Sequence, residues 1–333
     1  MKLSVLDYGL IDYGLIDYGK TASDAIQETI LLSQEAERLG YHQFWVAEHH
    51  GVKAFSISNP ELMIMHLANQ TKSIKIGSGG IMPLHYSSFK LAETLKTLET
   101  CHPNRVSIGL GNSLGTVKVS NALRSLHKAH DYEEVLEELK SWLIDESSSK
   151  EPLVQPTLSS FPDLYVLGSG QKSAYLAAKL GLGFTFGVFP FMDKDPLTEA
   201  KKLSSLYYHQ FEEYYPNKSP NLMVAAFVVI ADTSEEAENI AKTLDIWMLG
   251  NKDFNEFATF PTIEEANHYQ LTPEQKAKIK SNRHRMIVGD PKQVKDSLDA
   301  LVNASQAEEL LLIPLVPGLD QRIKSLKLLS QLY

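Results

Sequence analysis

Residues 73–80 read SIKIGSGG and residues 105–111 read RVSIGLG, so a short apolar run passes directly into glycines twice in succession. Each run is short enough to be a buried strand. Between them, residues 87–101 (SSFKLAETLKTLETC) show the apolar spacing of an amphipathic helix. Strand, helix and strand in this order predict parallel neighbouring strands, because a parallel crossover needs about a dozen residues.

The same alternation continues along the chain in both directions. The eight expected strands begin near residues 3, 44, 74, 105, 163, 184, 222 and 308. The expected helices cover residues 21–40, 60–71, 87–101, 131–146, 171–181, 196–214, 234–249 and 290–304. Eight βα units predict an α/β fold of the (β/α)8 TIM-barrel class. A doubly wound open sheet is the alternative, but it usually has fewer units or a phosphate fingerprint after its first strand.

The stretch from about 250 to 285 interrupts this rhythm. It is expected to be an insertion of helices and loop before the last βα unit, followed by a short strand at MIVG (286–289). No composition shift marks a second domain, so residues 1–333 are expected to form a single domain.

Composition limits the kinds of binding partner and the cellular compartment that are expected for this chain. The formal net charge is −9, so no basic surface predicts binding to nucleic acid or to an anionic membrane. No apolar stretch reaches the length of a membrane helix and no signal peptide is visible, which favours a cytoplasmic protein. The single cysteine, Cys101, excludes intramolecular disulfides and is expected to be a small, partly buried apolar residue.

In a barrel of this class the site lies where the strands end, so the candidate site residues are expected in the segments that follow the strands. The turn GSGQKSA (168–174) leads from a strand directly into a helix. Free backbone N–H groups there, with the hydroxyls of Ser169 and Ser173 and close approach at Gly170, could hold a phosphate. Lys172 could add charge. A routine capped turn is the alternative.

The glycines of GSGG and GLGN allow two readings. They let the backbone pass close to a flat ligand, or they permit a tight turn. Neither segment matches the dinucleotide fingerprint GxGxxG.

Three ionisable residues, Glu48, His49 and His50, follow the second expected strand. A metal site is one interpretation, with His85 as the only other well-placed ligand. Neighbouring side chains of a strand point to opposite faces, so both histidines are not expected to face the barrel mouth while the strand persists. We therefore expect no metal and favour one histidine acting in hydrogen bonding or acid–base catalysis.

These segments together resemble the bacterial luciferase-like flavin monooxygenases, in particular their MsnO8-type class. The matching segments, in order, are LSVLD (3–7), ERLGYHQFWVAEHH (37–50), IKIGSGGIMPLHYS (74–87), LAETLKTLE (91–99), NRVSIGLG (104–111), LYVLGSGQKSAYLAAKLGLGF (164–184) and MIVGDPKQV (286–294). They span nearly the whole chain. The resemblance implies a luciferase-like barrel with an insertion before the last units.

The resemblance also implies a site and a cofactor. FMN would place its phosphate at the turn containing Ser169, Gly170 and Ser173. Its ring would lie beside the backbone of Ser78, Gly79 and Gly80, with a cis peptide bond expected between the two glycines. His49 would be the active-site histidine near the reactive edge of the flavin, and Glu48 would orient its loop.

Two residues depart from the family pattern. Asn112 stands where relatives often carry an arginine near the phosphate, so one charge-assisted contact is absent and FMN binding is expected to be weaker or to use Lys172. Gly111 stands where the light-emitting members carry a cysteine, so light emission is not expected.

The implied activity has two components. A separate NAD(P)H-dependent reductase supplies reduced FMN, and the protein uses it with O2 to oxidise a small organic, aldehyde-like substrate. Relatives suggest a homodimer. Apolar residues that could line the substrate pocket are Leu84, Tyr86, Phe186 and Phe189. The alternatives are a flavin- or deazaflavin-dependent reductase without oxygen chemistry, a non-catalytic flavin-binding protein and a metal-dependent hydrolase.

The first strand is followed by a literal repeat, DYGLI-DYGLI-DYG, over residues 7–19. Relatives fit without the extra pentapeptide, so it is interpreted as a tandem duplication in a loop rather than as a structural repeat. It lies at the mouth of the expected barrel and could place Tyr8, Tyr13 or Tyr18 over the flavin or at a dimer interface. A neutral loop insertion is the alternative.

Overall fold

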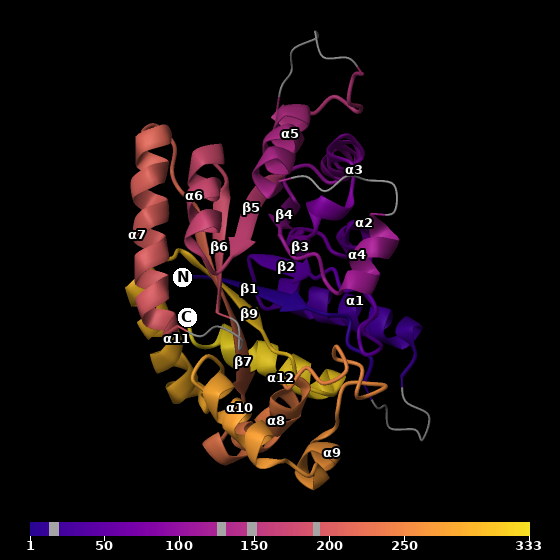
Figure 1. The fold of residues 1–333 in the computed structure, drawn as a ribbon, viewed down its shortest axis with the longest axis vertical. Coiled ribbons are helices and arrows are strands. Elements are labelled where there is room, and N and C mark those ends of the chain that lie inside the picture. The colour runs from indigo at the N-terminus through magenta and orange to yellow at the C-terminus, as the bar shows by residue number, and fades with distance from the viewer. Residues whose placement is uncertain (13–19, 125–130, 145–151, 189–193) are drawn as a thin grey trace.

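The computed structural model describes residues 1–12, 20–124, 131–144, 152–188 and 194–333 (Figure 1). Its strands are β1 (Lys2–Asp7), β2 (Gln43–Val46), β3 (Lys75–Ile81), β4 (Val106–Leu110), β5 (Asp163–Gly168), β6 (Gly183–Val188), β7 (Leu222–Ile230), β8 (Ile287–Gly289) and β9 (Glu309–Ile313). Each strand from β1 to β7 pairs with the next one along the chain. Strand β9 lies between β1 and β7 and pairs with both. All these pairings are parallel, so the eight predicted strands close into a barrel. Strand β8 is a short addition beside the end of β7.

Helices surround the barrel (Figure 1). They are α1 (Ala22–Arg38), α2 (Pro60–Gln70), α3 (Ser88–Cys101), α4 (Val117–Leu123), α5 (Tyr132–Ile144), α6 (Gln171–Leu180), α7 (Pro196–Tyr214), α8 (Ser234–Trp247), α9 (Ile263–His268), α10 (Pro273–Arg283), α11 (Pro291–Ser305) and α12 (Leu319–Ser330), with a 3-10 turn η1 (Pro83–His85). The eight predicted helices are all present. Helices α4 and α12 were not predicted: α4 is only about two turns long, and α12 has Gly318 as its N-cap residue and therefore no side-chain cap.

The segment between α8 and β8 departs from the regular alternation, as its sequence suggests. Turns occupy its first part, and the short helices α9 and α10 follow, each with a capping box at its start. The short strand expected near MIVG is β8.

The glycines of β3 and β4 lie inside the strands rather than after them, which corrects the sequence-based boundary of β3. Strand β3 continues to Ile81. A side chain at Gly77 would meet the Trp45 indole and the carbonyl oxygen of Ser107, and one at Gly109 would meet the carbonyl oxygen of Ser78. The buried Trp45 occupies the space that these side chains would fill. Close packing inside the barrel therefore explains these glycines.

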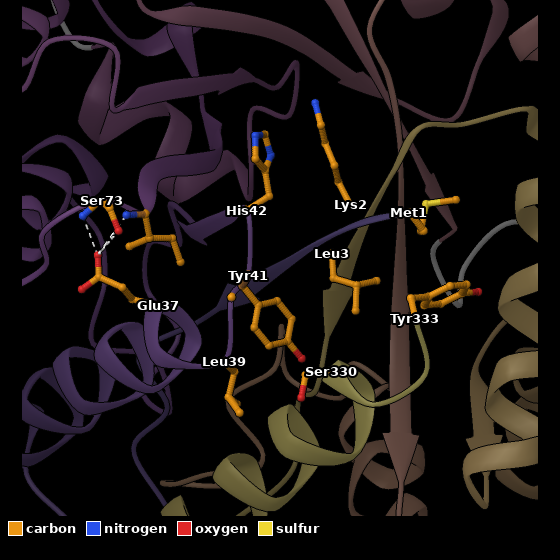
Figure 2. A pocket seen from close by; sticks show the side chains of 12 residues that line it. Met1, Lys2, Leu3, Glu37, Leu39, Tyr41, His42, Ser73, Ser330 and Tyr333 are labelled. Carbon is orange, nitrogen blue, oxygen red and sulfur yellow. Dashed lines mark hydrogen bonds between the residues drawn. The ribbon is translucent and has the colours of Figure 1, made fainter.

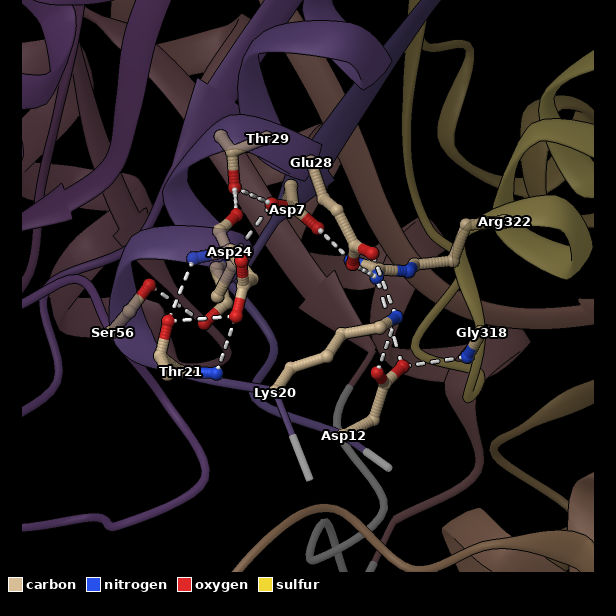
Figure 3. Close-up of polar contacts among 12 residues, drawn as sticks. Asp7, Asp12, Lys20, Thr21, Asp24, Glu28, Thr29, Ser56, Gly318 and Arg322 are labelled. Atoms are coloured by element: carbon tan, nitrogen blue, oxygen red, sulfur yellow. Dashed lines mark hydrogen bonds and ion pairs between the residues drawn. The ribbon is translucent and has the colours of Figure 1, made fainter. Parts of the chain in front are cut away.

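A buried ionic cluster joins the two ends of the chain (Figure 3). Arg322 on α12 is 2% exposed and forms ion pairs with Glu28, Asp7 and Asp12. The Lys20 ammonium lies 2.7 Å from carboxylate oxygens of both Asp12 and Glu28. The cluster therefore fixes the segment after β1 against α1 and α12.

The end of the barrel where strand β1 begins holds an open polar cavity of about 500 Å³ (Figure 2). Backbone N–H groups of Ser73 and Ile74 donate to the Glu37 carboxylate at 2.6 and 3.0 Å. Burial opposes ionisation of Glu37, but these hydrogen bonds lower its pKa to about 2. Both oxygens of this carboxylate already accept backbone hydrogen bonds, so it serves the structure of the α2–β3 loop.

Cys101, expected to be partly buried, is exposed because it is the last residue of α3. None of the helices among the described residues combines the length and apolar composition that a bilayer crossing requires.

Candidate active site

Two adjoining pockets lie where the barrel strands end. The aromatic pocket, of about 380 Å³, is lined by Tyr8, His49, Val52, Phe55, Ser113, Phe227, Trp247, Met248, Phe254 and Leu315. The polar pocket, of about 700 Å³, is lined by Glu48, His49, His50, Gly51, Val52, Met82, His85, Ser113, Gly115, Thr116, Lys118, Val119, Gly250, Lys252, Asp253, Phe254 and Asn255. They share His49, Val52, Ser113 and Phe254. The shared lining makes them two compartments of one cavity, at the end of the barrel where active sites of this fold lie.

His49 stands at the junction of the two compartments. Its ring packs against Tyr8 and Phe55, with ring centroids 4.8 and 5.1 Å away. Its Nδ1 atom is buried and has no hydrogen-bond partner among the described residues. Burial lowers the pKa of His49 to about 4, so the imidazole is neutral at pH 7. A neutral imidazole with a free nitrogen can exchange a hydrogen bond or a proton with a bound molecule.

Glu48 holds the segment after β2 against the segment after β3. One carboxylate oxygen accepts hydrogen bonds from the Tyr86 hydroxyl at 2.6 Å and faces His50 Nε2 at 2.7 Å. The other accepts the backbone N–H of Met82 at 2.9 Å. Burial and the Glu48 contact raise the pKa of Tyr86, which keeps this hydroxyl protonated as a donor. Glu48 therefore fixes the backbone next to His49.

Both His49 and His50 line the polar pocket, which corrects the expectation from strand alternation. Strand β2 ends at Val46, so the alternation of side chains stops before the histidines. His85 lines the same pocket, with its ring centroid 6.4 Å from that of His50. Within the described part of the chain, no group of three or more His, Cys, Asp or Glu side chains is placed to hold a metal.

The start of the 250–286 segment forms one wall of the cavity. Lys252, Asp253 and Phe254 all have positive φ angles, between 50° and 63°, which turns the chain sharply after Gly250. Asn255 ties this turn to the segment after β2: its amide donates to the Gly51 carbonyl at 2.7 Å and accepts the Lys53 N–H at 3.1 Å. The wall is thus joined to the segment that carries His49.

In the turn between β5 and α6, no side chain caps the start of the helix. Gly170 is the N-cap residue and provides no side-chain hydrogen bond to the first turn of α6. A side chain at Gly170 would meet no atom within 4 Å, so the approach to the helix start is open. Ser169 is half-buried and Ser173 is buried against Gly168. Lys172 forms an exposed ion pair with Asp131, 3.4 Å away.

The other predicted site residues lie near the cavity without lining either compartment. Ser78 is fully buried in β3, and its hydroxyl donates to the Gly109 carbonyl at 3.3 Å. The peptide bond between Gly79 and Gly80 is cis, as predicted. Asn112 is exposed, and its neighbour Ser113 reaches both compartments instead.

Of the apolar residues expected to line a pocket, Leu84, Tyr86 and Phe186 line neither compartment. Phe186 is buried in the barrel core, Leu84 packs against that core, and Tyr86 donates to Glu48. Phe189, Tyr13 and Tyr18 lie outside the described residues.

The aromatic lining was largely missed from the sequence. Tyr8 was considered as a loop residue, but Phe55, Phe227 and Trp247 come from three separate segments. Phe227 lies in a strand that is buried throughout its length, so its position was not distinguishable from core. A pocket assembled from distant segments leaves no local pattern.

Comparison with known proteins assigns the chain to a family. A family model described as luciferase-like monooxygenase matches residues 9–307. YwcH of Bacillus subtilis is 35% identical, with 94% of each chain covered. The N-acetyl-S-alkylcysteine monooxygenase of B. subtilis is 30% identical over 99% of this chain and 97% of its own. The solved structure of apo-MsnO8 superposes with a TM-score of 0.88 at 29% identity, covering 99% of this chain and 98% of that one.

Proposed function

Because this chain belongs to the luciferase-like monooxygenase family, we propose that it is an FMN-dependent monooxygenase. It takes reduced FMN from a separate NAD(P)H-dependent reductase and uses O2 to oxidise a small organic substrate. The observation that carries this proposal is the two-compartment cavity at the strand ends, with the neutral imidazole of His49 at the junction. We expect a homodimer, which sedimentation analysis would test.

The described residues fit FMN. The first turn of α6 has no side-chain cap, so its N–H groups and helix dipole remain available to a phosphate. Ser169, Gly170 and Ser173 would hold this group, and Lys172 would add charge only by leaving Asp131. The backbone of Ser78, Gly79 and Gly80 would support the flavin ring.

Reduced flavin, when bound, supplies the two electrons and the oxygen activation that the reaction needs. The residues of this chain prepare the site for it. His49 accepts or donates a proton at Nδ1, because this atom has no competing partner among the described residues. Glu48 keeps His49 in position through its three contacts. The rings of Tyr8, Phe55, Phe227 and Trp247 exclude water from the reacting centre.

A relative suggests the first substrate to test. The 30%-identical B. subtilis enzyme is named for N-acetyl-S-alkylcysteine, a thioether. We propose that thioethers of this kind, or aldehydes, place their apolar part in the aromatic pocket.

Isotope labelling tests the proposal. The protein is mixed with FMN, a catalytic amount of an NADH:FMN reductase, ¹⁸O2 and N-acetyl-S-alkylcysteines or aldehydes of increasing chain length. One ¹⁸O atom in the product is the expected result, and His49→Gln is expected to retain FMN but lose turnover. Substrate reduction in the absence of oxygen would instead support a reductase. FMN retention without turnover of any compound would support a non-catalytic flavin protein.

A further inference from the structure

Two lysines in the lining of the polar pocket form no ion pair with a described residue. The charged lining residues are Glu48, Lys118, Lys252 and Asp253. Both lysines are exposed at the rim, and neither forms an ion pair with a described residue. Both ammonium groups border the same cavity and are free to contact a molecule that enters it, which favours an anionic group there.

The two carboxylates in the lining, Glu48 and Asp253, differ in how they can affect an anionic ligand. Both oxygens of Glu48 are occupied by Tyr86, His50 and the Met82 N–H, and this carboxylate is buried. Asp253 is exposed at the rim beside Lys252 and can turn to water. The lysines are therefore the charges available to a molecule that enters the pocket.

A second, independent observation points to a ligand in the same compartment. His85 is 3% exposed, lines the polar pocket and has a buried Nδ1 atom without a hydrogen-bond partner among the described residues. Burial lowers the pKa of His85, so the ring is neutral at pH 7. A buried polar atom of this kind normally finds a partner. A polar group of a bound molecule would satisfy it.

The two compartments differ in chemistry. The aromatic pocket is closed by carbon-rich side chains, whereas the polar pocket carries the lysines and His85. We propose that the substrate is an amphipathic anion, with its apolar body in the aromatic pocket and its carboxylate or sulfonate held by Lys118, Lys252 and His85. The proposal rests on the proposed function only in taking this cavity as the substrate site.

A matched pair of fluorescent probes tests this inference without flavin or oxygen. 8-Anilinonaphthalene-1-sulfonate and N-phenyl-1-naphthylamine share an aromatic body, and only the first carries an anionic group. Lys118→Gln combined with Lys252→Gln is expected to weaken binding of the sulfonate by about tenfold or more, since one charge-assisted contact alone contributes about that much. Binding of the neutral probe should stay within about twofold. The matched control is Lys276→Gln with Lys280→Gln on α10, because these exposed lysines line neither compartment.

Two further measurements locate the probe and the cofactor. Energy transfer from Trp247 to the bound sulfonate should be lost in Trp247→Phe, which reports occupancy of the aromatic pocket. FMN affinity should not change in the double-lysine variant. Unchanged sulfonate binding in that variant, or an equal loss of both probes, overturns the inference. A loss of FMN binding without a loss of sulfonate binding also overturns it and assigns the lysines to the cofactor. Failure of the oxygen-labelling experiment leaves these probe results unaffected.

Discussion

His49 connects the protonation state of a single side chain with the stability of the fold. Its folded-state pKa of about 4 lies below the ordinary value of 6.5, because burial disfavours the charged ring. Between these two values the unfolded chain binds the proton more readily than the folded chain. Stability contributed by the neutral ring is therefore present above pH 6.5 and is lost as the pH falls toward 4.

The corresponding prediction concerns His49→Gln. Urea unfolding of the wild type should show a free energy of unfolding that decreases from pH 7 to pH 4, and the variant should show a smaller decrease. His268→Gln is the control, because His268 is exposed on α9. Identical pH profiles for wild type and His49→Gln would show that the ring is not desolvated.

At the scale of elements, a variant at the start of α6 can distinguish two roles for this turn, a routine helix cap and an anion site. Gly170 has a φ of −134°, which any residue adopts, and space around its Cβ position. Gly170→Asp should cap the helix and leave the melting temperature equal or slightly higher, since aspartate is a preferred N-cap. The added carboxylate should repel a phosphate and weaken FMN binding about tenfold or more.

Gly170→Ala is the matched variant, because it adds a side chain without charge. It should retain FMN binding within about threefold. FMN titration by fluorescence quenching and a thermal melt provide both readouts. If Gly170→Asp binds FMN as tightly as Gly170→Ala does, the phosphate lies elsewhere.

The inserted part of the tandem repeat lies between two residues, Asp12 and Lys20, that are hydrogen-bonded to each other. The Lys20 N–H donates to the Asp12 carbonyl at 3.0 Å, so residues 12 and 20 are joined by one backbone hydrogen bond. Asp12 itself is fully buried and accepts the Gly318 N–H at 2.6 Å. Removing residues 12–16 places Asp17 directly after Ile11, so the shortened chain still offers an aspartate for this position.

Deletion of residues 12–16 should therefore preserve the fold. The remaining Asp-Tyr-Gly-Lys can close the same hydrogen bond as a β-turn with glycine in its third position. The shorter loop should change the free energy of unfolding by only about 1 kcal/mol, in the stabilising direction. Chemical denaturation measures this change. A loss of several kcal/mol would show that the extra copy makes contacts of its own.

At the scale of the whole molecule, Arg322 ties the end of the chain to its beginning. It is buried among Asp7, Asp12 and Glu28, which lie on the segment after β1 and on α1 (Figure 3). Strands β1 and β9 also pair, so the barrel closes at the same place. Contacts between residues so distant in sequence form late and close a large loop.

Arg322→Met should destabilise the protein by about 3–5 kcal/mol, because it leaves buried carboxylates without their partner. Lys75→Met is the comparison, since it removes a partly exposed ion pair with Asp163 and should cost about 1 kcal/mol or less. Equilibrium unfolding in urea measures both. Similar small losses for the two variants would show that Lys20 alone neutralises the cluster.

The sequence by itself determined the order of the strands and helices, because periodicity, helix caps and glycine stops are local signals. Through the family resemblance it also predicted the cis bond between Gly79 and Gly80. The sequence misplaced the end of β3, because the role of its glycines depends on a distant partner. Side chains at Gly77 in β3 and Gly109 in β4 would collide with Trp45, which lies on β2.

Only the tertiary structure decided which residues form the cavity. Tyr8, Phe55, Phe227 and Trp247 converge because barrel closure brings four segments to one rim, and no sequence spacing encodes that convergence. The early end of β2 likewise turned both His49 and His50 toward one pocket. Local patterns specify elements, whereas a site depends on distances that exist only after the barrel has closed.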